Sequence, residues 1–435
     1  MRRAKAISFF HGLGTLALLA GCSMGGNPPG MRAFVGATLI DGTGATPIDR
    51  SVLIVEGGRI QAVGVQGEVE IPEEAERVDL TGRTIIPGLI NSHGHVGDVR
   101  GLEARQYSRE NVLDQLGRYA RYGITTVVSL GDDREEGVRV RDEQEQDSTL
   151  NRARLYVAGP VLNPSSPEEA LTQVQRIAEL GADWAKFRID SNLGAAQKMT
   201  PETYQKLIEE AHRHNIPVAA HVIELADAKA AVRAGVDFIG HSVRDVAVDD
   251  ELIALLRERR VCLTPTLTRE LSTFVYGSRP SFFDDPFFLA EVDPAVLEQL
   301  QDPARQQRTR ENRGAQYWQA QLPLALQNLK ALSDAGVGIA MGTDSGPAGR
   351  FQGYFEHLEM SMMADAGLTP MQILVAATGD AARCVGLDEE LGTLEPGKRA
   401  DFVVLGENPL SNIDNTRSIE SVWINGNRVP GRGEE

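Results

Sequence analysis

Basic residues are scarce in this chain: 44 lysines and arginines stand against 61 aspartates and glutamates in 435 residues, a formal charge of −17. Nucleic-acid binding needs clustered Lys and Arg, which the sequence does not show, so we expect no nucleic-acid partner. Low-complexity tracts and internal repeats are also lacking, which excludes a solenoid. The remaining composition is that of a globular protein, and the length allows one large domain of about 250 residues beside a smaller one.

Cysteine is rare as well, with three in the whole chain. Cys262 lies in an apolar strand-like run and Cys384 in a helical run. Both places are typical of small hydrophobic core residues. We therefore expect two buried free thiols rather than a structural disulfide.

The third cysteine, Cys22, ends a segment typical of export. Residues 1–5 are basic, residues 6–20 are mainly apolar and small, and residues 19–22 (Leu-Ala-Gly-Cys) resemble a bacterial lipobox. We expect a lipoprotein signal peptide over residues 1–21, a lipidated Cys22 and a flexible tether over 22–30. An uncleaved anchor and a plain secretory signal are the alternatives, although the apolar stretch is short for a membrane span of about 20 residues.

Ser23 follows this cysteine, where an aspartate would favour retention at the inner membrane. The expected location is therefore the bacterial cell envelope, at the outer membrane and facing the periplasm. The lipid anchor would be the only contact with the membrane.

Both ends of the mature chain alternate short strand-like runs with tight turns. Residues 31–83 contain the pair Gly57-Gly58, and residues 391–435 contain Asn425-Gly426. Gly-Gly and Asn-Gly pairs are hairpin signals. Because each segment is too small to hold a core alone, we expect the two to pair into one small β-sandwich domain.

Residues 84–390 alternate apolar strand runs with helical patterns, as βα units do. Helices fit residues 201–213 and 225–234, each followed by a stop signal. The strand runs are eight in number: 84–90, 124–130, 154–158, 183–189, 216–221, 236–241, 261–267 and 337–343. Eight parallel strands close a barrel, so the predicted fold class is α/β, a (β/α)8 TIM barrel.

A long connection at about residues 268–307 interrupts this alternation. It contains four prolines and six aromatic residues, Phe274, Tyr276, Phe282, Phe283, Phe287 and Phe288. Long insertions after a barrel strand tend to serve as lids over the site. The aromatic side chains can equally pack the insertion onto the barrel, and the sequence does not separate these two interpretations.

Metal-binding residue types stand in order at the ends of the strand runs. His93 and His95 end the first run, and residues two apart on a strand point to the same face, so both imidazoles can bind one ion. His221, His241 and Asp344 each follow a later run. Ligands at the ends of successive strands meet at one rim of a barrel, which predicts a metal-dependent enzyme.

The other histidines are not expected as ligands. His212 and His214 are also two apart, but they fall on a helix, where their side chains diverge. His357 lies in a helical run after the last strand. For His357 we favour a packing or supporting role over ligation.

Taken together, these residues resemble the amidohydrolase superfamily. The resemblance rests on residues 87–95 (Pro-Gly-Leu-Ile-Asn-Ser-His-Gly-His), on the lysine and single histidines of runs four to six, on residues 342–346 (Gly-Thr-Asp-Ser-Gly) and on the tail at 392–401. It covers nearly the whole mature chain. Gly346-Pro347 and residues 356–360 are most similar to the branch of imidazolonepropionase-like hydrolases and metal-dependent Xaa-Pro dipeptidase-like enzymes. Many relatives have Asp where this chain has Asn91, which removes a charge outside the ligand pair.

The resemblance implies a centre of two divalent metal ions. His93, His95 and Asp344 would hold the more buried ion, while His221 and His241 would hold the more exposed one. Lys186 would be carboxylated by carbon dioxide and bridge both ions, because burial among apolar groups lowers the pKa of an amine and only a neutral amine captures carbon dioxide. An ordinary lysine paired with an acid is the alternative. Zinc is the default metal for these ligands, with manganese, cobalt and iron left open.

The implied activity is hydrolysis of a carbon–nitrogen bond by metal-activated hydroxide, in an amide, dipeptide, N-acyl amino acid or cyclic amide. Asp344 would be the catalytic residue that takes a proton from the water and gives it to the leaving group. The same apparatus can attack lactones or phosphotriesters, which the sequence does not separate. A lipoprotein that binds a ligand without catalysis is a third alternative, although every expected ligand is present.

A small-molecule substrate is expected to contact four residues. Arg188 shares a strand face with Lys186 and can anchor a carboxylate, and Val222 stands beside the second metal position. Tyr276 belongs to the aromatic insertion, and His357 follows the last strand. The apolar Val222 and the aromatic insertion favour an acyl group of low polarity. A homo-oligomer is compatible with the sequence, which does not fix the oligomeric state.

Overall fold

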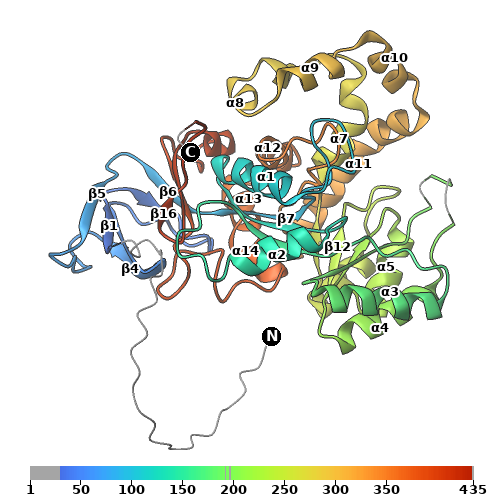
Figure 1. Cartoon of the computed structure of the whole chain (residues 1–435), viewed down its shortest axis with the longest axis horizontal. Coiled ribbons are helices and arrows are strands. Elements are labelled where there is room, and N and C mark those ends of the chain that lie inside the picture. Colours follow the sequence, from blue (N-terminus) through green and yellow to red (C-terminus); the bar gives the residue numbers. More distant parts are fainter. Residues whose placement is uncertain (1–29, 192, 195–196, 434–435) are drawn as a thin grey trace, which may run out of the picture.

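The structure, a computed structural model, describes residues 30–191, 193–194 and 197–433. The predicted signal peptide and Cys22 lie outside these residues. Parallel strands with surrounding helices form the centre of a mixed α/β fold, and the strands of the two terminal segments gather at one end of the molecule (Figure 1). In the described part of the chain, no helix combines the length and the apolar character needed to cross a bilayer.

The terminal segments build two sheets. The first has the order β4-β3-β1-β5 and consists of β1 (Arg32–Val35), β3 (Ser51–Glu56), β4 (Arg59–Val65) and β5 (Glu76–Asp79). The second has the order β16-β15-β14-β6-β2 and consists of β2 (Thr38–Leu39), β6 (Thr84–Pro87), β14 (Phe402–Leu405), β15 (Ile419–Ile424) and β16 (Asn427–Arg428). The antiparallel pair of β6 and β14 joins the two ends of the chain.

Side chains from both sheets pack into one hydrophobic cluster. The ring of Phe34 on β1 lies 4.9 Å, between centroids, from each of the rings of Phe402 and Trp423. Both predicted hairpins are confirmed, since Gly57-Gly58 joins β3 to β4 and Asn425-Gly426 joins β15 to β16. All four residues have positive φ, which is the conformation that favours Gly and Asn in two-residue hairpin turns.

The parallel strands of the central region form two sheets. β7 (Leu89–Gly94), β8 (Ile124–Ser129) and β9 (Arg154–Val157) form one, and β10 (Ala185–Arg188), β11 (Val218–His221), β12 (Phe238–Gly240) and β13 (Cys262–Thr264) form the other. Isolated parallel bridges link Leu162 with Phe187, Leu263 with Ile339, and Ser345 with Gly94. The pairings therefore run from β7 to β13 in chain order, and the last bridge returns to β7.

Two of the expected strand runs differ from the prediction. The run 84–90 is broken at Gly88, so that β6 joins the terminal sheet and only β7 joins the parallel strands. A Cβ at Gly88 would lie 2.1 Å from Thr125 Oγ1, so the chain passes β8 too closely for a side chain. The run 337–343 forms bridges but no regular strand, because its N–H groups bond four different partners, including Leu263 O and His93 O. The other six runs each contain a strand.

Helices follow the strands. α4 (Pro201–Arg213) and α5 (Leu225–Ala234) have the predicted bounds, and Thr200 caps α4 by accepting a hydrogen bond from Thr203 N. The others outside the insertion are α1 (Arg109–Arg121), α2 (Glu135–Glu143), α3 (Pro167–Leu180), α6 (Asp250–Arg259), α12 (Tyr354–Asp365), α13 (Pro370–Ala376), α14 (Gly379–Cys384) and the 3₁₀ helix η3 (Ile413–Arg417).

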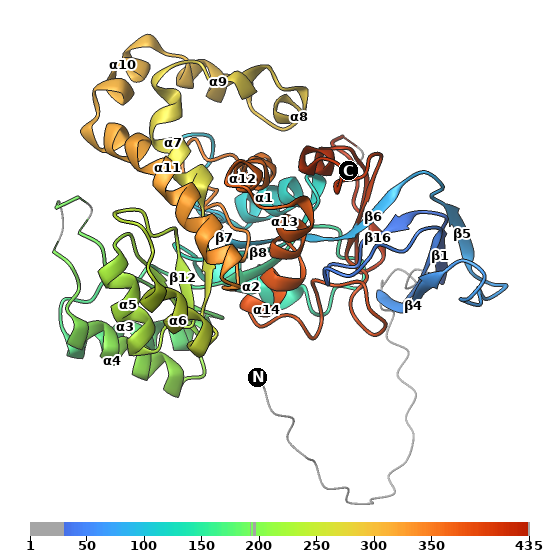
Figure 2. The same cartoon turned by 180° about the vertical axis from the view of Figure 1, so that it is seen from behind.

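The insertion after β13 is helical, and its segment from α8 (Pro286–Leu289) to α10 (Pro303–Glu311) stands at the top of the molecule, above α12 (Figure 2). Phe288 lies 5.1 Å from Phe282 and 4.9 Å from Tyr354 of α12, between ring centroids, so its aromatic residues pack on one another and on the helix beneath. The elements are α7 (Leu267–Phe274), η1 (Val275–Gly277), η2 (Ser281–Asp284), α8 (Pro286–Leu289), α9 (Pro294–Leu300), α10 (Pro303–Glu311) and α11 (Arg313–Asp334).

Cys262 and Cys384 form a disulfide that joins β13 to α14, with their Cα atoms 5.7 Å apart. The prediction of two free thiols was wrong. It treated the strand and the helix separately, and a separation of 122 residues leaves no local sign that the two elements are neighbours.

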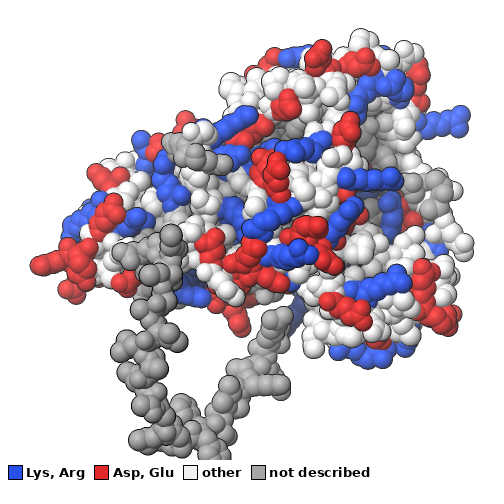
Figure 3. All heavy atoms as spheres, in the orientation of Figure 1, with Lys and Arg blue, Asp and Glu red and all other residues white. Residues whose placement is uncertain are grey.

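Charged side chains of both signs are interspersed over the face of the molecule seen in Figure 3. The connection between β4 and β5 carries four exposed glutamates, Glu68, Glu70, Glu73 and Glu74. These glutamates contribute to the excess of acidic over basic residues in the sequence.

Candidate metal centre

Three of the predicted ligands meet at the end of β7. His93 lies in β7, His95 follows it, and Asp344 lies beside them because the bridge between Gly94 and Ser345 holds the two segments together. The ligand atoms of these three residues lie within 4.8 Å of one another. His95 Nε2 is 2.7 Å and His93 Nε2 is 3.8 Å from Asp344 Oδ1. Two imidazoles and a carboxylate at this spacing can hold a metal ion.

Lys186 of β10 reaches the same cluster. Its buried Nζ lies 3.2 Å from His93 Nε2. Burial lowers the pKa of Lys186 to about 7, while the charge of Asp344 acts in the opposite direction. A Cβ at Gly240 would lie 2.5 Å from this nitrogen, so a glycine on β12 makes room for the lysine.

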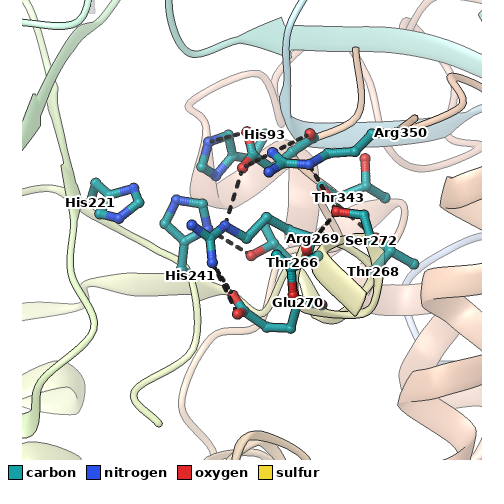
Figure 4. A network of polar contacts seen from close by, with 12 residues as sticks. His93, His221, His241, Thr266, Thr268, Arg269, Glu270, Ser272, Thr343 and Arg350 are labelled. Carbon is teal, nitrogen blue, oxygen red and sulfur yellow. Dashed lines mark hydrogen bonds and ion pairs between the residues drawn. The ribbon is translucent and has the colours of Figure 1, made fainter. Parts of the chain in front are cut away.

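His221 and His241 come from the next two strands. His221 ends β11, His241 follows β12, and their ring centroids are 4.1 Å apart. The ring of His241 also lies 4.7 Å from that of His93, so the three imidazoles are neighbours (Figure 4). Together with Lys186, the predicted ligands form one continuous cluster. His241 and Asp344 both have positive φ, a strained backbone that is common at functional sites.

Most of these imidazoles are held neutral. Burial lowers the pKa of His221 to about 3 and the pKa values of His93 and His241 well below the usual range. For His95 burial acts in the same direction, but the hydrogen bond with Asp344 and the charges of Asp344 and Asp132 together raise the pKa. Neutral imidazole is the form that binds a metal, and burial therefore prepares three of the four for binding.

Asp190, which the sequence did not predict, connects His221 to Arg188. Its Oδ2 lies 2.8 Å from His221 Nε2 and accepts a hydrogen bond of 2.6 Å from Arg188 Nε. Burial opposes the effect, but His221 and Arg188 hold the pKa of Asp190 below its usual range. Arg188 was predicted to bind the substrate. In the structure its guanidinium group pairs with Asp190, which lies next to His221. The place of Asp190 just after the fourth run was the signal that could have identified it.

Two further arginines, also missed, face Asp344 from the opposite side. Arg350 Nη1 donates a hydrogen bond of 2.6 Å to Asp344 Oδ2, and Arg269 Nε lies 3.8 Å from the same oxygen (Figure 4). One carboxylate oxygen therefore faces the histidines and the other faces the guanidinium groups. Burial opposes the effect, but Arg350 and His95 hold the pKa of Asp344 well below its usual range.

Two buried glutamates of α12 support the cluster. Glu356 accepts hydrogen bonds from Asn91, Thr343 and Ser345, which flank His93 and Asp344 in the chain. Glu359 accepts from the backbone N–H groups of Leu267 and Thr268 at the start of α7. The residue before α7, Thr266, contacts His241, with Oγ1 2.7 Å from Nδ1. The two carboxylates thus hold the segments on both sides of the centre.

The other predicted substrate residues lie in packed surroundings. Val222 is fully buried in the main hydrophobic cluster. Tyr276 is buried and donates a hydrogen bond to Gly349 O in the loop that carries Arg350. His357 has its Nε2 2.8 Å from Tyr122 O and its Nδ1 2.9 Å from Thr416 Oγ1, so the structure does not bring it to the metal ligands. Substrate contact by these residues stays a prediction.

His212 and His214 behave as expected for a helix end. His212 Nε2 lies 2.8 Å from Asp237, whereas His214 is the C-cap of α4 and lies 3.5 Å from Glu210. The two rings have different partners.

The residues of the cluster fit a divalent metal. The donor set of imidazole nitrogens and a carboxylate oxygen is the one that zinc and similar ions prefer. His93 Nδ1 is also buried without a hydrogen-bond partner. A buried polar atom of this kind is rare unless it serves a ligand.

Fold and cluster together define an α/β protein with residues that can hold a metal ion, and comparison of the sequence with known families agrees. Residues 84–429 match the amidohydrolase family, and the chain belongs to it. The chain is 28% identical to an ochratoxinase from Aspergillus niger over 297 residues, which cover 65% of this chain and 53% of that protein. The match therefore spans about half of the length of that relative.

Two further likenesses cover most of both chains. An imidazolonepropionase from Streptomyces coelicolor is 26% identical over 380 residues, 82% of this chain and 85% of that protein. The crystal structure of a putative prolidase from Bifidobacterium longum superimposes with a TM-score of 0.75 at 27% identity, covering 93% of this chain and 96% of that one. Both likenesses agree with the branch of the family that the motifs indicate.

Proposed function

We propose that this protein is a metal-dependent hydrolase that cleaves a carbon–nitrogen bond with a centre of two divalent ions. The observation that carries the proposal is the convergence of the six expected ligands, His93, His95, Lys186, His221, His241 and Asp344, into one buried cluster. We propose equally that the parallel strands close into one eight-stranded barrel around this cluster, and that the two terminal sheets form the small β-sandwich.

The chemistry divides between the metal and the side chains. Divalent ions held by these residues would lower the pKa of water toward about 7 and would polarise a carbonyl group. Asp344 takes the proton and passes it to the leaving nitrogen. Arg350 orients the carboxylate by holding Oδ2, so that Oδ1 stays turned toward the histidines.

In this proposal Lys186 would help to hold the ions through a carbamate. Its neutral amine forms a bond from nitrogen to the carbon of carbon dioxide and loses a proton, which leaves a carbamate anion. Labelling with ¹³C-bicarbonate should give a carbamate carbon signal in the metal-loaded protein and none in Lys186→Ala. An unlabelled wild-type protein with two bound metals would show that the bridge is not a carbamate.

Metal analysis followed by a mass-spectrometric screen tests the function. The metal-loaded protein should hold two ions per chain and hydrolyse members of a set of dipeptides, N-acyl amino acids and cyclic imides. His93→Asn should lose one ion and all turnover, whereas the matched change His214→Asn, at the exposed C-cap of α4, should leave both unchanged. Turnover confined to lactones in the same screen would replace the amide proposal with ester hydrolysis.

We further propose that Cys22 is lipidated and anchors the protein to the outer membrane. Metabolic labelling with radioactive palmitate should label the wild type and not Cys22→Ser. Label that persists in Cys22→Ser would refute lipidation at this residue.

A further inference from the structure

A cluster of buried charges beside Asp344 carries more cations than anions among the described residues. Arg244 pairs with Glu270 at 3.0 Å, Arg269 pairs with the same carboxylate at 2.9 Å, and Arg350 pairs with Asp344 at 2.6 Å. Three guanidinium groups therefore share two carboxylates. Arg188 and Asp190 form a neighbouring ion pair with no net charge, so they do not change this excess of positive charge.

This excess charge is held away from water. The Arg244 side chain is fully buried and that of Arg269 is 11% exposed. Both guanidinium groups lie over the ring of Trp318 of α11, at 4.8 Å and 5.1 Å from its centroid. Because a buried charge without a counter-charge is costly, an excess of this kind indicates an anion that is supplied from outside the chain.

One unpartnered donor of the cluster lies next to Asp344, at the proposed reaction site. Arg269 Nε is buried without a hydrogen-bond partner and lies 3.8 Å from Asp344 Oδ2. Arg350, which holds the same oxygen of Asp344, borders a cavity of about 370 Å³. That cavity is walled by the aromatic residues Tyr122, Phe288, Phe351 and Tyr354.

We infer that Arg269 and Arg350 form an anion subsite next to Asp344, so that the natural substrate carries a carboxylate close to the bond that is cleaved. The inference rests on the proposed function, because it assigns the substrate class of that site. Planar guanidinium groups bind carboxylates through paired hydrogen bonds, which favours a carboxylate over a neutral amide. Among the candidate substrates, dipeptides and N-acyl amino acids have this group, whereas uncharged amides lack it.

Binding of two matched probes separates this subsite from the hydrolytic activity. We expect calorimetry to show that the metal-loaded protein binds benzoate about tenfold or more tightly than benzamide. In Arg269→Met the two probes should bind within about threefold of each other, because the guanidinium group that donates hydrogen bonds to the carboxylate of benzoate is removed. Arg176→Met, a matched change at an exposed arginine of α3, should keep the wild-type preference.

Each outcome bears on the subsite. Equal binding of both probes by the wild type overturns it, and so does a benzoate preference that survives in Arg269→Met, since the carboxylate would then be recognised by the metal alone. If Arg269→Met does not fold, Arg269→Lys keeps the buried charge without the planar fork and should lose most of the preference. Absence of any turnover in the substrate screen, with the benzoate preference intact, would refute the hydrolase and keep the anion subsite.

Discussion

The side-chain amide of Asn91 donates a hydrogen bond of 2.6 Å to the buried carboxylate of Glu356. Asn91 Oδ1 in turn accepts a bond of 3.0 Å from the backbone N–H of His93. Asn91 therefore links α12 to the backbone of His93. An aspartate at position 91 would place a second carboxylate against Glu356, so the neutral amide of asparagine matches its surroundings.

Glu356→Gln should weaken the more buried metal position. The glutamine would present an N–H₂ group to side chains that now donate to the carboxylate, so the segments of His93 and Asp344 would lose their common anchor. Partners behind a ligand typically contribute 10- to 100-fold to metal affinity, and we expect a loss of about that size in a chelator competition titration. The control is Glu258→Gln at an exposed position of α6. Unchanged metal affinity in a folded Glu356→Gln protein would show that the carboxylate only packs.

Asp344→Asn should abolish turnover while the fold is kept. The amide removes the group that takes and returns the proton, a role that contributes about 10²- to 10⁴-fold to rates. Circular dichroism should match the wild type, and kcat on the best substrate of the screen should fall by at least about 100-fold. A variant with full activity would exclude Asp344 as the base.

The sequence was sufficient to predict that three histidines meet at the ends of strands. His93, His221 and His241 follow apolar runs with strand character, and parallel strands bring their carboxyl ends together, so local pattern and topology lead to the same residues. The bounds of α4 and α5 were predicted because the residues that start and stop a helix lie next to it in the chain. These signals lie within or beside the element that they predict, so they are recognisable without knowledge of tertiary contacts.

The supporting residues could not be predicted, because their roles depend on contacts between distant segments. Glu356 is 265 residues from Asn91, and Cys384 is 122 residues from Cys262. Arg269 lies in the insertion, where no strand or helix period relates it to Asp344. The break of the first run at Gly88 has the same origin, since only the close approach of Thr125 reveals why the strand changes sheets.

His357 should make the folded protein sensitive to acid. Burial lowers the pKa of His357 to about 4 from 6.5 in the unfolded chain. The folded state then binds fewer protons than the unfolded state, so this residue stabilises the fold fully above pH 6.5 and loses that contribution as the pH falls through about 4. A shift of this size corresponds to about 3 kcal/mol.

Urea unfolding at several pH values between 7 and 4 measures this effect. The free energy of unfolding should fall less steeply with acid in His357→Gln than in the wild type. His214→Gln, at an exposed histidine, should follow the wild type. Parallel pH profiles for wild type and His357→Gln would mean that other groups cause the acid sensitivity.

The bond between Cys262 and Cys384 should make stability depend on redox conditions. It closes a chain segment that spans β13, the whole insertion and α12, with a separation of 122 residues. A bridge over so long a loop restricts the unfolded chain strongly, and bridges of this kind contribute about 2 to 5 kcal/mol. Reductant should therefore lower the melting temperature of the wild type, and the double change Cys262→Ala with Cys384→Ala should give the lower value with or without reductant. Alkylation of the denatured, unreduced protein should leave both cysteines unmodified. Modification of both would show that the thiols are free, and it would also remove the one feature of the described chain that favours an oxidising compartment such as the periplasm.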